Sequence, residues 1–288
     1  DARSRLCHNC ASGFRHVSGS YQCQACPSPS DSALLLALGG MVVTAGLSVV
    51  VWFAISDGGK ADMSELVRRI GFNYLQIIAL SADFPLRWPA ALRTLFLSQG
   101  ALATAGDIVV SPDCLWPSAE PATLFYNKEI FYAVLPVVLT LVMLALWRCY
   151  AALPGRRWRG RDYVGHVNAK DRFVISTAAL LWLFYPTFAK NAFAVFACRS
   201  VEGVAYLTAD LNEACFAGRH LLMLVVVGVP QLALWVVGLP LSIFVILYRH
   251  RDRLSHPPVR LRYGLFFTGY RQDVFYWEVV QAGKKALV

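Results

Sequence analysis

Apolar residues gather in long blocks along this chain, and short polar or basic stretches separate the blocks. Four blocks reach or approach the roughly 20 residues with which a helix crosses about 30 Å of hydrocarbon. A shorter block with more polar residues and an apolar stretch near residue 288 add two further candidates. The pattern predicts an all-α fold, a polytopic transmembrane helix bundle, with spans at 33–55, 66–84, 130–150, 172–197 and 219–248 and the start of another span at 278–288.

Two intervening stretches predict helices that lie along the membrane surface. Asp83, Pro85 and Pro89 break the second block, and apolar residues then recur at helical spacing. Residues 88–105 are therefore expected to form an amphipathic helix at the outer interface, with one long kinked crossing as the alternative. Residues 255–277 mix tyrosine and phenylalanine with arginine, which suits a cytoplasmic interfacial segment.

The last long block contains a Gly-x-Pro step twice, at Gly228-Val229-Pro230 and at Gly238-Leu239-Pro240. Proline in a membrane helix leaves backbone carbonyl groups without their usual N–H donors, and neighbouring helices or water must satisfy them. Bends are therefore expected at both steps.

Composition and charge agree with a membrane protein. Apolar residues make up 57% of the chain and charged residues 16%, against about 45–50% and about 25% in soluble domains. The net charge of +9 comes largely from two arginine-rich stretches, one at 148–172 and one at 249–262. The positive-inside rule places both stretches in the cytoplasm, which puts the N-terminus outside the cell and removes the need for a nucleic-acid partner.

The expected location is the plasma membrane or another surface membrane. Expected partners are membrane lipid, other parts of the same larger protein, and further membrane or extracellular subunits. The chain begins inside a cysteine pattern without an initiating methionine, and a new apolar stretch starts at 278–288. We therefore expect both ends to be cuts through a longer protein.

Four cysteines give residues 1–30 the character of a cysteine-rich extracellular segment. Cys7-x-x-Cys10 and Cys23-x-x-Cys26 have zinc-ribbon spacing. An extracellular position favours two disulfides over metal. Three connectivities are open, and the nested pairs Cys10–Cys23 and Cys7–Cys26 are preferred.

Further cysteines lie near the predicted spans. Cys198 and Cys215 flank one outer loop, so a bridge between them would close a short ring. Cys114 is the alternative partner for either of them. Cys149 is expected to be a small buried apolar residue and not a reactive thiol.

No catalytic constellation or cofactor motif is found, and no histidine has a second histidine or a carboxylate at metal-ligand spacing, so an enzyme is not expected. Ionisable and polar residues at membrane depth are the candidates instead. Lys190, beside Asn191, lies about 12 Å below the outer end of its span. Asp83 is its expected partner, with Asp210 and Glu213 of the outer loop as other candidates and a snorkelling lysine as the alternative. His220 and Glu278 complete the candidates; Glu278 and the neighbouring Lys284 and Lys285 are either buried or flank the next helix.

The chain resembles a family of large multi-pass surface proteins of unicellular eukaryotes. In that family, ephrin-receptor-like cysteine-rich repeats precede a transmembrane domain similar to TRP channels. The resemblance covers nearly the whole chain and is carried by Cys7 to Cys26, Phe72 to Gln76 with Trp88-Pro89, Asp113-Cys114, Tyr185-Pro186-Thr187, Phe196 to Cys198, Asp210 to Cys215, His220, Gly238 to Pro240, Arg262 to Arg271 and Tyr276-Trp277-Glu278.

The resemblance implies further membrane helices after the Tyr276-Trp277-Glu278 element. If the protein is a channel, those helices would line its pore, and the present helices would form a peripheral TRP- or polycystin-like sensor bundle. The alternative is a cell-surface receptor, adhesion protein or membrane anchor that does not conduct. A transporter ranks third, because the two Gly-x-Pro steps lie in one helix and not in matching halves.

Overall fold

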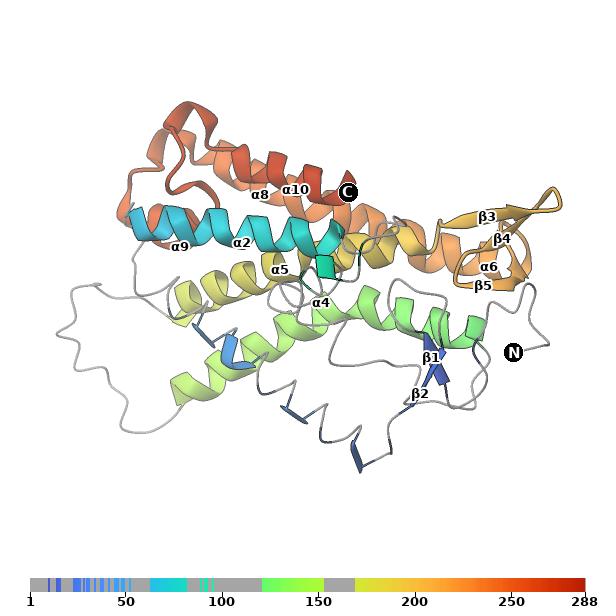
Figure 1. The fold of residues 1–288 in the computed structure, drawn as a ribbon. Helices are drawn as coiled ribbons and strands as arrows, with labels where there is room; N and C mark the ends of the chain where they lie inside the picture. Colours follow the sequence, from blue (N-terminus) through green and yellow to red (C-terminus); the bar gives the residue numbers. More distant parts are fainter. Residues whose placement is uncertain are drawn as a thin grey trace.

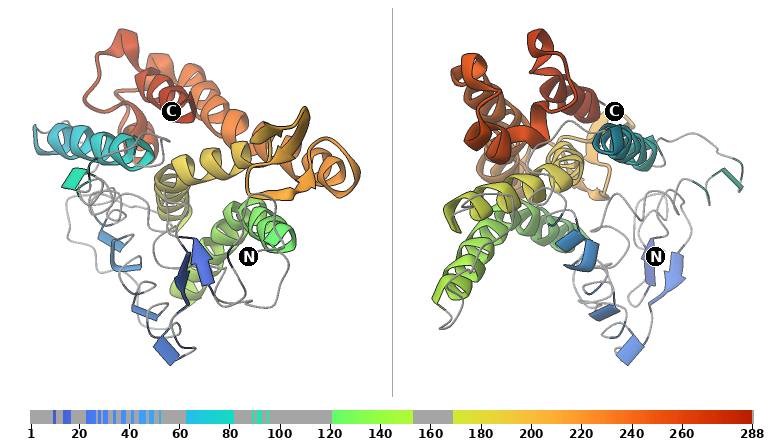
Figure 2. Two further views of the ribbon diagram at one scale, coloured as in Figure 1. Left: turned by 45° about the vertical axis from the view of Figure 1, so that its right-hand side comes forward. Right: turned by 90° about the vertical axis from the view of Figure 1, so that its left-hand side faces the viewer.

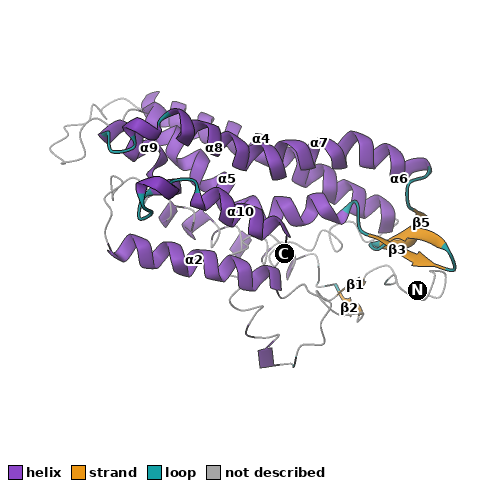
Figure 3. Ribbon diagram, turned by 90° about the horizontal axis from the view of Figure 1, so that it is seen from above, coloured by secondary structure: helices purple, strands orange, loops and turns teal. Residues whose placement is uncertain are grey.

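A computed structural model describes residues 63–81, 121–152 and 169–287, together with short pieces and single positions between 10 and 95. The expected span 33–55 and the expected helix 88–105 lie mostly outside the described residues. In the described part, long helices lie side by side and a small sheet caps one end of them, as Figures 1 and 3 show. We call this end the sheet end.

Three helices are long and apolar enough to cross a membrane: Ala122–Ala152, Ala169–Ala194 and Gly218–Arg249. The first lies in α4 (Pro121–Ala152) and the second is α5 (Ala169–Ala194). α5 is largely buried, whereas the other two expose most of their apolar side chains. α2 (Met63–Ser81) is shorter and more polar. The views in Figures 1 and 2 place α5 between α4 on one side and α2 with the C-terminal helices on the other.

The helix directions alternate. Trp235 Nε1 donates to Ala133 O at 2.9 Å and Arg219 Nη1 to Thr123 Oγ1 at 3.1 Å, so α4 and Gly218–Arg249 run the same way. His220, near the start of that helix, contacts Val195 O just past the end of α5, and Val236, further along it, accepts from Tyr185 Oη within α5 at 3.1 Å, so α5 is antiparallel to it. This alternation is what successive membrane crossings require.

The helix Gly218–Arg249 contains two π-helical turns where bends were expected. It comprises α6 (Gly218–Met223), η3 (Leu224–Gly228), α7 (Val229–Gln231), η4 (Leu232–Gly238) and α8 (Leu239–Arg249), with η3 and η4 π-helical. Pro230 and Pro240 follow the π turns closely. A Cβ at Gly238 would lie 2.9 Å from the Ala233 carbonyl oxygen, so the second turn requires glycine there.

Residues 198–214 correct the all-α expectation. They form a three-stranded antiparallel sheet of β3 (Cys198–Val201), β4 (Val204–Leu207) and β5 (Asp210–Ala214). Glu202 and Gly203 both have positive φ, 52° and 82°, as the two central residues of a type I′ hairpin turn do. A second, two-stranded antiparallel sheet joins β1 (Phe14–His16) to β2 (Cys23–Ala25).

The C-terminal part folds back onto the bundle. After η5 (Arg251–Arg253) come α9 (Pro257–Phe267), η6 (Gln272–Val274) and α10 (Trp277–Leu287). An ion pair between Arg262 and the buried Asp171 ties α9 to the start of α5. The main apolar core of this region consists of Trp182, Tyr185, Ile243, Leu247, Leu254, Phe266 and Ala282.

Candidate functional site

α10 carries two opposite charges on its buried face. Glu278, Ala282 and Lys285 are spaced four and three residues apart, so they lie on one side of the helix. Glu278 and Lys285 are each only 3% exposed. Lys284, one position away, is exposed and lies 5.2 Å from the Trp277 ring. The helix thus presents one lysine to the interior and the next to the surface.

Neutral donors hold the Glu278 carboxylate. Trp182 Nε1 donates to Oε1 at 3.1 Å, and Tyr270 Oη donates to Oε2 at 2.8 Å. Burial, and next the negative charge of Glu278, raise the pKa of the Tyr270 hydroxyl to about 12. Tyr270 therefore keeps its proton at neutral pH and remains a donor.

Neutral acceptors hold the Lys285 ammonium group. Its Nζ donates to Asn73 Oδ1 at 2.5 Å and to Gln76 Oε1 at 2.6 Å, both on α2. Gln76 is fully buried, and its Nε2 donates to Leu183 O of α5 at 3.2 Å. The amide is therefore oriented by α5, with its oxygen turned toward the lysine.

Arg69, one helical turn before Asn73 on α2, connects the same group of helices. Its Nη2 donates to Gly264 O of α9 at 3.2 Å, and its guanidinium lies 5.2 Å from the Tyr270 ring centroid. We call Arg69, Asn73, Gln76, Trp182, Tyr270, Glu278 and Lys285 the α10 network.

The α10 network fixes both the rotation and the register of α10. Rotation about its axis would turn Glu278 and Lys285 away from α5 and α2 together, and a shift along the axis would break both sets of hydrogen bonds. Each buried charge has directed hydrogen bonds, as a charge inside a protein requires.

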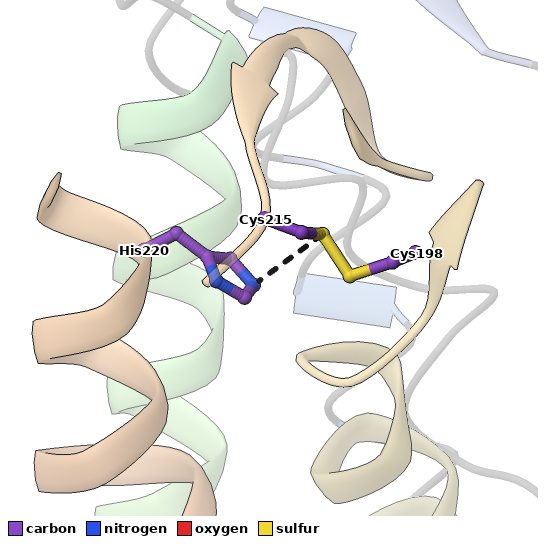
Figure 4. A group of neighbouring side chains, drawn as sticks. All are labelled: Cys198, Cys215 and His220. Carbon is purple, nitrogen blue, oxygen red and sulfur yellow. Dashed lines mark hydrogen bonds between the residues drawn. A yellow bond between two sulfur atoms is a disulfide. The ribbon is translucent and has the colours of Figure 1, made fainter. Parts of the chain in front are cut away.

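A second polar group lies at the sheet end, where Cys198 and Cys215 form a disulfide (Figure 4). These are the two cysteines that the sequence analysis paired. Within the described ranges, Cys198, Cys215 and His220 are the one group of histidine, cysteine and acidic side chains close enough to hold a metal. The disulfide engages both sulfur atoms, however, and a metal would need them as thiolates.

The His220 side chain connects the end of α5 to the start of α6 by hydrogen bonds. It is fully buried, and Phe216 N donates to its Nδ1 at 3.0 Å. Because Nδ1 accepts, Nε2 carries the ring proton and donates to Val195 O at 3.0 Å. Cys215 Sγ lies 4.0 Å from Nε2. The ring thus joins the end of α5 to the start of α6 beside the disulfide.

Lys190 does not face the bundle interior. It is exposed, while its neighbours Ala189 and Asn191 are buried. Successive residues of a helix point about 100° apart, so packing at 189 and 192 turns residue 190 outward. Asn191 Nδ2 donates to Thr187 O of its own helix at 2.8 Å. Asp83, the expected partner of Lys190, lies outside the described residues.

The remaining cysteines divide between the described and undescribed parts. Cys10 and Cys23 form a disulfide, and Cys26 is also disulfide-bonded. Cys7 and Cys114 lie outside the described residues. Cys149 is a free thiol and is exposed, which corrects the expected burial: it lies on the outward side of α4.

Sequence reasoning missed most of the α10 network. It singled out Glu278 and left Lys285 open, but it did not select Asn73 or Gln76. A signal was present, because these two amides stand three residues apart and so share one face of α2. What the sequence lacks is the identity of the helix that this face meets.

The described architecture defines a membrane-associated helical protein with a disulfide-bonded sheet at one end. The chain is similar to "Cysteine repeat modular protein A" of Toxoplasma gondii, with 22% identity over 98% of this chain and 11% of that protein. The chain therefore spans about a tenth of the length of this curated relative. No family model matches the chain, and no solved structure matches it.

Proposed function

We propose that the chain is the membrane domain of a large cysteine-rich surface protein and acts as a channel-type sensor bundle, similar to those of TRP or polycystin channels. The observation that carries this proposal is the pair of buried charges on α10. Ala286, next to Lys285, packs against Ala189, Ala192 and Val236 within two candidate spans. Charges at such depth are costly and typically mark ion paths, gates or switches.

The α10 network gives the bundle a mechanical role. Because α2 and α5 hold α10 in one rotation and one register, a movement of either helix is transmitted to α10. The resemblance implies further helices after α10, and these would receive the movement. We assign the chain this coupling role and no enzymatic one.

Charge distribution supports an orientation with the sheet outside. The described basic residues at the end opposite the sheet outnumber the acidic ones: Arg148, Lys170, Arg172, Arg249, Arg251, Arg253, Arg260, Arg262 and Arg271 stand against Asp171, Asp252 and Asp273. At the sheet end, Arg199 and Arg219 stand against Glu202, Asp210 and Glu213. The positive-inside rule favours the cytoplasm for the basic end.

Labelling of single introduced cysteines tests this orientation. Glu202→Cys, in the hairpin turn, should react in intact cells with a membrane-impermeant maleimide, and Arg271→Cys should react only after permeabilisation. Both positions are exposed. Labelling of Arg271→Cys in intact cells would reverse or refute the orientation.

Ion flux through the full-length protein tests the channel-type function. Lys285→Met should alter flux or its gating at normal surface expression, whereas Lys284→Met should not, because Lys284 lies outside the α10 network. Lack of flux from the wild-type protein at normal surface expression would reject conduction.

A receptor or membrane anchor is the second candidate. Its specific support is that the similar Toxoplasma protein extends far beyond the aligned region, which covers 11% of it. In that case the α10 network would serve only to hold the bundle together. Lys285→Met would then lower surface expression in proportion to stability and leave no separate effect on flux.

A further inference from the structure

His220 is fully buried, and each of its ring nitrogens makes a hydrogen bond to a backbone group. Phe216 N donates to Nδ1 at 3.0 Å, and Nε2 donates to Val195 O at 3.0 Å. One nitrogen accepts and the other donates, which is the pattern of a neutral ring, because both nitrogens of a charged ring are donors. A proton added at Nδ1 would therefore place two N–H groups against each other and break the bond to Phe216.

The backbone at Phe216 has a conformation that phenylalanine rarely adopts. Its φ is 59°, in the left-handed region, and a bulky residue keeps such a conformation only where the surrounding structure enforces it. Two contacts with His220 hold it there: the hydrogen bond to Nδ1 and an edge-to-face contact of the two rings, whose centroids lie 5.8 Å apart. Loss of the hydrogen bond would let this turn relax.

Val195, the second partner of the ring, lies directly after α5 and also packs against the long helix Gly218–Arg249. A Cβ added at Gly228, the last residue of η3, would lie 3.2 Å from Val195 Cγ1, so the two helices approach closely there. The end of α5 is thus joined to Gly218–Arg249 at two levels, about two helical turns apart. The His220 bond is the polar one of the two connections.

The acidic side chains of β5, the strand before His220, have other partners. Glu213 Oε2 accepts from Arg219 at 3.0 Å, and Asp210 Oδ1 accepts from Asn212 N at 3.0 Å. Other titratable or charged groups on the elements around the ring are Tyr126, Lys128, Glu129, Lys190, Arg199, Glu202 and Tyr206. Within the described ranges the hydrogen bonds of the ring go to backbone groups, with Cys215 Sγ 4.0 Å from Nε2 (Figure 4).

We propose that protonation of His220 releases the end of α5 from the start of α6, which makes the sheet end a pH-sensitive switch. An opened ring takes up a proton near pH 6.5, about the ordinary value for histidine, without losing a hydrogen bond. The connection is therefore intact above about pH 6.5 and weakens as the pH falls below it. Further along the helices, the bond from Tyr185 Oη to Val236 O does not involve a histidine, so we expect the opening to stay at the sheet end.

Reduction of the Cys198–Cys215 disulfide by tris(2-carboxyethyl)phosphine, in the full chain in lipid nanodiscs, measures this opening. The rate at pH 5.5 divided by the rate at pH 7.5 should be about five- to tenfold larger for the wild type than for His220→Asn. One proton taken up near pH 6.5 changes an opening equilibrium by at most about tenfold over this interval. His220→Asn offers an oxygen acceptor to Phe216 N without a titratable ring, and comparing the two ratios cancels the pH dependence of the reagent.

His250→Asn is the matched control. His250 Nδ1 lies 2.8 Å from Ile246 O, and a protonated ring keeps that bond, so this variant should have the wild-type ratio. The proposal fails if the wild-type ratio equals that of His220→Asn, or if His250→Asn abolishes the pH effect.

Thermal unfolding provides a second measurement, which does not depend on access of the reductant. From pH 7.5 to pH 5.5 the wild-type midpoint should fall by about 3–5 °C more than that of His220→Asn or His220→Gln, the equivalent of a tenfold change in the unfolding equilibrium. A wild-type midpoint that is the same at both pH values would overturn the proposal without any variant. Neither measurement involves ion flux or the orientation in the membrane, so the proposed function is tested separately.

Discussion

Replacing Gln76 by leucine should destabilise the bundle strongly, because it leaves the buried Lys285 ammonium with one amide acceptor where it had two. A hydrogen bond to a charged group contributes about 1.5–3 kcal/mol, and the bond from Gln76 Nε2 to Leu183 O contributes about 0.6 kcal/mol more. We expect a loss of about 3 kcal/mol in the free energy of unfolding. For a chain of this size, that loss lowers the unfolding midpoint by about 6–10 °C.

The double variant with Lys285→Met should recover most of this loss. Lys285→Met alone leaves two amide oxygens without their donor and should cost about 1–2 kcal/mol. With Gln76→Leu, charge and acceptor disappear together, and replacing both partners of a buried polar pair by apolar groups is often nearly neutral. We expect the double variant to cost about 1 kcal/mol, which is less than the Gln76→Leu variant alone.

Fluorescence-detected thermal unfolding and SDS titration in detergent micelles would measure these values. Lys284→Met is the matched control, since it removes a neighbouring exposed lysine whose contact with the Trp277 ring contributes only about 0.5–1 kcal/mol. If the two single variants add within about 0.5 kcal/mol, the residues are not coupled. In that case the buried hydrogen bonds of Lys285 do not stabilise the bundle.

Four further variants address the backbone, a hydrogen bond between helices and the surface. Gly238→Ala should lower the free energy of unfolding by about 1–3 kcal/mol, because its Cβ meets a backbone oxygen at 2.9 Å; Gly71→Ala, with open space around it in α2, should raise it by up to about 1 kcal/mol. Tyr185→Phe should cost about 1 kcal/mol by removing the donor to Val236 O. Lys190→Met should change it by less than about 0.5 kcal/mol, since Lys190 is exposed. Thermal unfolding in one detergent tests all four, and a Lys190→Met effect as large as that of Lys285→Met would contradict the assignment of the interior lysine.

The sequence predicted where the long helices lie along the chain better than which side of each helix is buried. Apolar blocks and their lengths suffice to place α4, α5 and Gly218–Arg249, because the cost of exposing apolar surface does not depend on tertiary detail. Depth along a helix also follows from counting, and it drew attention to Lys190. The rotation of a helix about its own axis does not follow from counting residues, because it depends on which other helices pack against it. Lys190 is exposed, and among the described lysines Lys285 is the buried one.

The sheet at 198–214 and the contacts of the α10 network could not be predicted from the sequence, for different reasons. The sheet at 198–214 depends on positive φ at Glu202 and Gly203, and glutamate is an unusual residue at such a turn. Contacts of the α10 network span long sequence distances: Lys285 and Gln76 are 209 residues apart. No local pattern specifies a pairing of that kind.

Prolines within three helices create the sites at which these helices accept hydrogen bonds from their neighbours. Three hydrogen bonds between helices end on carbonyl groups three or four residues before a proline: Ala133 before Pro136, Leu183 before Pro186 and Val236 before Pro240. A proline ring removes one N–H donor and pushes against the preceding turn, so the carbonyls there are open to outside donors. Each proline-containing helix thereby offers a hydrogen-bond acceptor to a neighbouring helix in an otherwise apolar surface. Trp235, Gln76 and Tyr185 supply the donors, which explains how apolar helices with little to distinguish their surfaces pack in a single register.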